Sequence, residues 1–116
     1  MGNRIGIIFH ENYKYFSPLI YDHWGGEDMK ERIYSYLEYY NEKYYEEEHD
    51  GHLYNCGHMA VGYLVFIKAD KDVRVENLSD SELERLKLDH NYPNEFDYGC
   101  LLVNVNENNF GNIDIC

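Results

Sequence analysis

Arg4-Ile-Gly-Ile-Ile-Phe9 is short, apolar and rich in β-branched side chains. Such a run predicts a buried β-strand. A second run, Leu19-Ile-Tyr-Asp-His-Trp24, follows Pro18, and proline is tolerated at the first position of a strand. A polar and aromatic turn joins the two runs, so we predict an antiparallel hairpin.

The C-terminal part of the chain predicts a second hairpin. Tyr98 to Val105 alternates so that Leu101, Val103 and Val105 share one face of a strand. A turn over residues 106–109 leads to a last strand from Phe110 to Ile115. A short strand over 73–75 is a further candidate.

Two main helices are predicted between the hairpins. Apolar residues recur every three or four positions from Glu27 to about Glu48, which indicates one amphipathic helix. The second helix is predicted from about His52 to Gly62 or beyond. Its apolar tail, residues 63–67, is compatible with a helix end or with a strand, because periodicity alone does not separate the two.

A short helix is predicted within the polar and acidic segment 68–97. Ser79 and Glu82 have the spacing of a capping box, and Leu78 with Leu83 has the spacing of a hydrophobic staple. We therefore expect a single α+β domain over residues 1–116. It would contain an antiparallel sheet of about four strands, two main helices packed on one face, and a short helix in the acidic insert.

Charge is the strongest functional signal in the chain. Ten Lys and Arg stand against 22 Asp and Glu, for a net charge of −12, and 13 tyrosines are interspersed. Such a surface repels phosphate backbones and anionic lipids. We expect no direct nucleic-acid partner, no membrane partner and no cofactor. A basic host protein is the expected partner, and a homodimer remains open.

The acids gather in two segments. Residues 27–50 hold nine acids and three bases, and residues 70–97 hold nine acids and four bases. Carboxylates along a helix can replace a row of phosphates opposite arginines, and tyrosine is favoured at interfaces. A solvated face that maintains solubility is the alternative explanation. The predicted binding residues are Glu38, Tyr39, Glu42, Tyr45, Glu46, Glu47 and Glu48.

Histidines and cysteines suggest two further kinds of site. Zinc ligands could come from His49, His52, Cys56 and His58, although their spacing matches no standard zinc finger. Cys56 with His52 or His58, or Cys100 with a distant histidine, could form a thiol–imidazole pair. The alternative is that both cysteines pack in the core. The corresponding function would be a metal-dependent hydrolase.

A small-ligand pocket is the other alternative. Arg4, His23 and Trp24 could stack a base and hold its phosphate, and the function would then be sequestration of a nucleotide signal. Further phosphate contacts could come from Lys14 and Arg32. Aromatic core packing with a structural histidine is the simpler explanation of these residues.

Three segments resemble a family of small uncharacterised proteins from bacteriophages and other mobile elements. They are Gly2-Asn3-Arg4, the strand end His23-Trp24-Gly25-Gly26, and Asp97 to Val103. The acidic segment 68–97 departs from that family. The resemblance implies a viral setting and brings no established activity, so it assigns no catalytic residue.

The sequence therefore predicts an acidic, non-enzymatic viral or mobile-element protein in the cytoplasm of the host cell. It would occlude a basic nucleic-acid-binding site, in the manner of a defence-system inhibitor such as an anti-CRISPR protein. The three cysteines have no framework spacing, which favours reduced thiols and a cytoplasmic setting.

Overall fold

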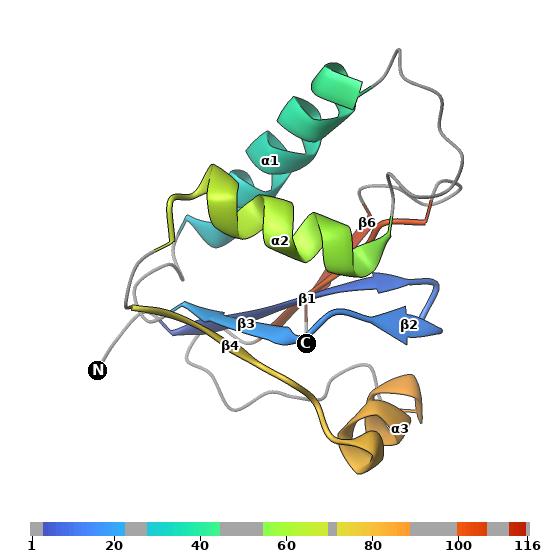
Figure 1. Ribbon diagram of the computed structural model, residues 1–116. Helices are drawn as coiled ribbons and strands as arrows, with labels where there is room; N and C mark the ends of the chain where they lie inside the picture. The colour runs from blue at the N-terminus through green and yellow to red at the C-terminus, as the bar shows by residue number, and fades with distance from the viewer. Residues whose placement is uncertain are drawn as a thin grey trace.

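The computed structural model describes residues 4–22, 28–44, 55–69, 72–88, 100–106 and 112–115. Their order is β1 (Ile5–Glu11), β2 (Tyr15–Phe16), β3 (Leu19–Asp22), α1 (Met29–Tyr44), α2 (Cys56–Phe66), β4 (Val73–Glu76), α3 (Asp80–Leu88), β5 (Cys100–Asn104) and β6 (Asn112–Ile115). The strands form one sheet with α1 and α2 on one face and α3 on the other (Figure 1). This confirms the α+β class and the pair of main helices on one face.

The sheet consists of two antiparallel hairpins joined by a central parallel pair. Its strand order is β4-β3-β1-β5-β6, and β2 pairs with the far end of β1. The β1–β3 and β5–β6 pairs are antiparallel, as the sequence predicts. The β1–β5 pair is parallel, with Gly6 opposite Cys100 and His10 opposite Asn104. The sheet is therefore mostly antiparallel.

Both central strands are buried on both faces, which is why they are apolar at consecutive positions. Ile7 and Phe9 of β1 face the core under α1 and α2, together with Leu101 of β5. Ile8 and Leu102 point the other way, into a smaller core under α3. Leu86 of α3 is completely buried there. Helix α3 of the acidic insert thus packs on the second face of the sheet.

Helix α2 begins later than the sequence predicts. Asn55 has an extended backbone, and its side-chain oxygen accepts a hydrogen bond from His58 N at 3.1 Å. This cap starts the helix at Cys56 instead of near His52. The ambiguous residues 63–66 continue the helix, because Tyr63 is buried against the sheet while Val65 faces outward.

Between β2 and β3, the buried side chain of Ser17 accepts a hydrogen bond from the backbone of β1 that a backbone carbonyl would normally accept. Ser17 N donates to Phe9 O at 2.8 Å, and Phe9 N donates to the Ser17 hydroxyl at 3.0 Å. Pro18 follows, and a proline has no N–H with which to continue the ladder. The hydroxyl of Ser17 also donates to the Pro18 carbonyl at 2.9 Å.

Ser17→Ala is expected to lower the free energy of unfolding by about 1 to 3 kcal/mol, because the buried Phe9 N–H loses its acceptor. Urea denaturation followed by circular dichroism measures the change. Ser35→Ala on the exposed side of α1 is the matched control, with an expected change within about 0.5 kcal/mol. Equal effects of the two substitutions would contradict the role given to the Ser17 hydroxyl.

Candidate functional site

The apolar residues of helix α1 lie on its inward side, and exposed charged residues lie on its outward side. Its inward side is fully or almost fully buried and consists of Met29, Ile33, Tyr36, Leu37 and Tyr40. Glu31 and Glu38 are exposed on the outward side, seven residues apart and therefore two turns along one stripe. Tyr34 and Tyr39 remain 49% and 45% exposed. The helix therefore presents carboxylates with aromatic rings beside them.

The predicted binding residues are only partly covered by the structure. Glu38 and Tyr39 are exposed on α1. Glu42 lies in the same helix, one turn after Glu38, although its side chain lies outside the described part. The remaining predictions lie outside the described residues, namely Tyr45, Glu46, Glu47 and Glu48.

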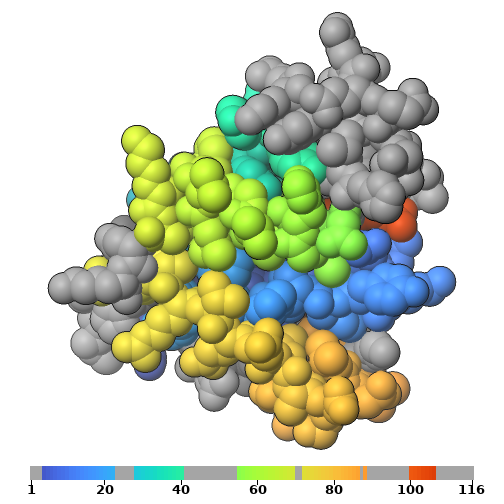
Figure 2. Space-filling view, in the orientation of Figure 1, coloured from blue at the N-terminus to red at the C-terminus, as the bar shows by residue number. Residues whose placement is uncertain are grey.

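Helix α2 lies beside α1 and carries apolar residues on every side. Its buried residues are Cys56, Met59, Ala60 and Tyr63. Val61 and Val65 point outward and are 63% and 73% exposed. In Figure 2 the outer surface of α2 faces the viewer above the strands, and α3 lies below the strands. This outer surface is unusually apolar for a chain of such high charge.

A groove of about 230 Å³ runs between the two helices. Tyr36 and Tyr40 of α1 line it together with Tyr39, and Val61, Val65 and Phe66 contribute from α2. The Tyr39 and Phe66 rings lie 5.3 Å apart, centroid to centroid. We call this the α1/α2 groove. The sequence alone does not predict this groove, and the one signal for it is the apolar character of all sides of α2.

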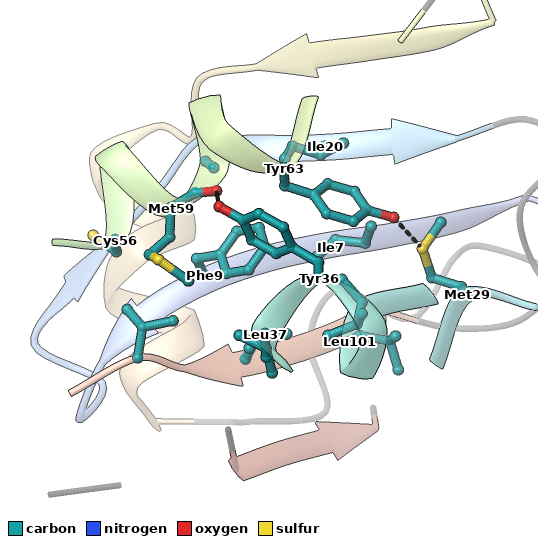
Figure 3. Close-up of a cluster of buried hydrophobic side chains, with 14 of the residues drawn as sticks. Ile7, Phe9, Ile20, Met29, Tyr36, Leu37, Cys56, Met59, Tyr63 and Leu101 are labelled. Carbon is teal, nitrogen blue, oxygen red and sulfur yellow. Dashed lines mark hydrogen bonds between the residues drawn. The ribbon is translucent and has the colours of Figure 1, made fainter. Parts of the chain in front are cut away.

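The floor of the α1/α2 groove is rigidly held. The Tyr36 hydroxyl donates to the Met59 carbonyl at 2.8 Å, and the Tyr63 hydroxyl donates to the Met29 sulfur at 2.9 Å (Figure 3). The Tyr36 ring also packs against Phe9 and Tyr63 in edge-on contacts. Fixed aromatic rings of this kind provide contact area with little loss of conformational entropy on binding.

The three basic residues considered for phosphate binding do not converge. Arg4 precedes β1 and Lys14 lies in the turn after it, so the strand separates them by roughly 20 Å. Arg32 is bound to Asp22 by an ion pair of 3.3 Å. His23 and Trp24 of the predicted pocket lie outside the described residues.

The predicted metal and thiol sites are not assembled by the residues that the structure describes. Cys56 is buried and His58 is exposed, and side chains two positions apart lie on different sides of a helix. His49 and His52 lie outside the described residues. Within the described ranges, no group of three or more His, Cys, Asp or Glu side chains could hold a metal ion. Cys100 is buried in β5 against the α3 side.

Burial, assisted by Glu11, favours the protonated form of the Cys56 thiol. Burial, then the hydrogen bond to Glu11 and its negative charge, raise the pKa of the Cys56 thiol to about 12. The same carboxylate accepts a hydrogen bond from Cys56 N at 3.1 Å. A nucleophilic cysteine needs a lowered pKa, so this environment opposes catalysis by the Cys56 thiol.

Stability is expected to fall at alkaline pH. Burial raises the pKa of Cys56 and also that of Tyr63, whose ordinary values are 9.0 and 10.0. Above about pH 9 the unfolded chain releases these protons while the folded chain keeps them, so the free energy of unfolding decreases as the pH rises. Urea titrations from pH 8 to pH 11 measure the effect. Cys56→Ala should show a shallower decrease, and parallel curves would contradict the assignment of Cys56.

Comparisons with protein-family models, with curated proteins and with solved structures found no match to this chain. Within the described residues, no helix is both long enough and apolar enough to cross a membrane. The candidate site therefore rests on its own geometry: the exposed stripe of α1 and the neighbouring α1/α2 groove.

Proposed function

We propose that this chain is a non-enzymatic binding protein of a virus or mobile element, which occludes the basic nucleic-acid-binding site of a host protein, such as a component of a defence system. One observation carries the proposal: in a chain of net charge −12, α1 turns Glu31 and Glu38 outward beside half-exposed Tyr34 and Tyr39. Exposed carboxylates can take the place of phosphates opposite arginine side chains.

The helices described in the two acidic segments do not share one face of the sheet. α1 and α3 lie on opposite faces of the sheet, so a single flat partner cannot contact both (Figure 1). The exposed side chains described in α3 are Asp80, Ser81, Glu84, Arg85 and Leu88, and none is aromatic. Tyrosine adds much of the contact energy at interfaces, which favours α1 as the docking face.

The experiment compares two variants of equal charge. Glu38→Lys/Glu42→Lys alters α1, whereas Glu76→Lys/Glu84→Lys changes net charge equally at the end of β4 and on α3. Each protein is immobilised and exposed to the DNA-cellulose-binding fraction of a bacterial lysate. We expect the unmodified protein and the control variant to retain a DNA-binding protein, and the α1 variant to lose it.

Displacement by duplex DNA tests the occlusion itself. The retained protein, once purified, should be released by added DNA and by salt, because exposed charges are screened at high ionic strength. Retention that persists in excess DNA, or equal loss in both charge variants, would overturn the proposal.

A further inference from the structure

The exposed residues of α2 are His58, Val61 and Val65, so its outer surface is mostly apolar. A helix with apolar residues on all sides is normally buried on all sides. Here Val61 and Val65, one turn apart, are both more than half exposed. They form a ridge beside the α1/α2 groove, and the buried Tyr36 and Tyr40 rings form its floor.

The dimensions of the groove suit side chains better than a metabolite. Its volume of about 230 Å³ is below the range of roughly 300 to 1,000 Å³ that small-molecule pockets occupy. The aromatic and branched aliphatic side chains that line the groove favour the binding of one or two apolar side chains of a ligand. The half-exposed ring of Tyr39 at the rim can also accept a lysine or arginine over its face.

The net charge of the chain indicates whether a second copy of the chain or another partner occupies the groove. Two copies would bring a net charge of −12 against −12, which opposes self-association through this face. The carboxylate stripe of Glu31 and Glu38 lies about 100° around α1 from Tyr39, beside the rim of the groove and outside it. A basic ligand with apolar anchors is complementary to both features.

We propose that the α1/α2 groove receives an amphipathic basic helix of the partner protein. Its apolar residues, spaced three or four apart, would pack on Val61, Val65 and Phe66, with lysine or arginine on its flanks. This inference rests on the proposed function and adds the form in which the partner is recognised: a helix seated in a groove, in addition to an acidic face.

A pair of synthetic peptides tests the inference. The first is an Ala-rich peptide of about 15 residues with leucines along one helical stripe and lysines elsewhere, since shorter helices do not form in water. The second has the same composition with the leucines spread around the helix. Isothermal titration calorimetry should show the striped peptide binding at least about tenfold more tightly, a difference of about 1.4 kcal/mol.

Two matched variants locate the binding site. Val65→Asp should weaken the striped peptide at least about tenfold, although it adds a negative charge that attracts lysines. Val75→Asp makes the same change at a half-exposed valine of β4 and should leave binding unchanged. Both valines are exposed, so neither substitution disturbs the core.

The outcomes separate the two proposals. If both peptides bind equally and Val65→Asp has no effect, the proposed helix binding in the α1/α2 groove is wrong, but the proposed function of the α1 carboxylates is not contradicted. Binding of neither peptide at low salt would overturn both. A dimer in sedimentation experiments that Val65→Asp abolishes would assign the groove to a second copy and overturn the inference.

Discussion

Tyr36→Ala is expected to remove about 3 to 5 kcal/mol from the free energy of unfolding, the largest effect of any substitution considered for this chain. The side chain is 1% exposed and connects α1 to α2 and to the sheet. Its ring contacts Phe9, Tyr40, Tyr63 and Phe66. Domains of this size have total stabilities of about 5 to 15 kcal/mol, so the variant should be close to unfolding at physiological temperature.

Tyr36→Phe provides the comparison, because it keeps the ring and loses only the hydrogen bond to the Met59 carbonyl. We expect it to cost about 0.5 to 1.5 kcal/mol. Urea denaturation followed by far-ultraviolet circular dichroism measures both variants. A loss below about 1 kcal/mol for Tyr36→Ala would show that the ring is not central to the core.

Gly62→Ala is expected to destabilise the protein by about 1 to 3 kcal/mol, even though alanine is the better helix former by about 1 kcal/mol. A Cβ atom added at Gly62 would lie 2.5 Å from the Tyr36 hydroxyl oxygen. That oxygen lies at the end of a buried ring and is bound to the Met59 carbonyl, so it cannot move away freely. The helix or the tyrosine must therefore move.

The same substitution should reverse its effect when the hydroxyl is absent. In a Tyr36→Phe background the next nearest atoms to the added Cβ are ring carbons at 3.6 and 3.9 Å, which is ordinary contact. Gly62→Ala should then be neutral or stabilising by up to about 1 kcal/mol. The double-mutant cycle should give a coupling free energy of about 1 to 4 kcal/mol.

Val61→Ala is the control for this cycle, because Val61 is the exposed neighbour of Gly62 in α2. Its effect should be the same in both backgrounds. An additive result for Gly62→Ala and Tyr36→Phe would mean that the close approach of the two helices does not depend on the missing Cβ.

The features that the sequence predicts correctly are those set by nearby residues. The capping box is present: Glu82 N donates to the Ser79 hydroxyl at 3.2 Å, and Ser79 N donates to the Glu82 carboxylate at 2.9 Å. The inward side of α1 also follows its spacing of three and four. The capping box and the apolar spacing involve residues that are close together in the sequence, so both can be recognised without knowledge of the tertiary structure.

The features that the sequence does not predict depend on distant residues. Each hairpin is visible locally, but nothing near Gly6 or Cys100 fixes the relative direction of β1 and β5. Tyr36 is almost completely buried because α2 covers it, which the sequence of α1 alone does not indicate. For the same reason the site was predicted as glutamates and tyrosines of one helix, and the α1/α2 groove requires both helices in place.

The parallel contact of β1 with β5 has a consequence for synthesis. The ribosome must release the chain through Asn104 before Ile7, Ile8 and Phe9 obtain their central neighbour. Until then β1 has an unpaired edge at what will be the centre of the sheet, and an unpaired strand edge is prone to aggregation. Such long-range pairing also slows folding.

We therefore expect ribosome-stalled chains that stop before β5 to remain protease-sensitive. Protection from protease should arise only after β5 has left the ribosome.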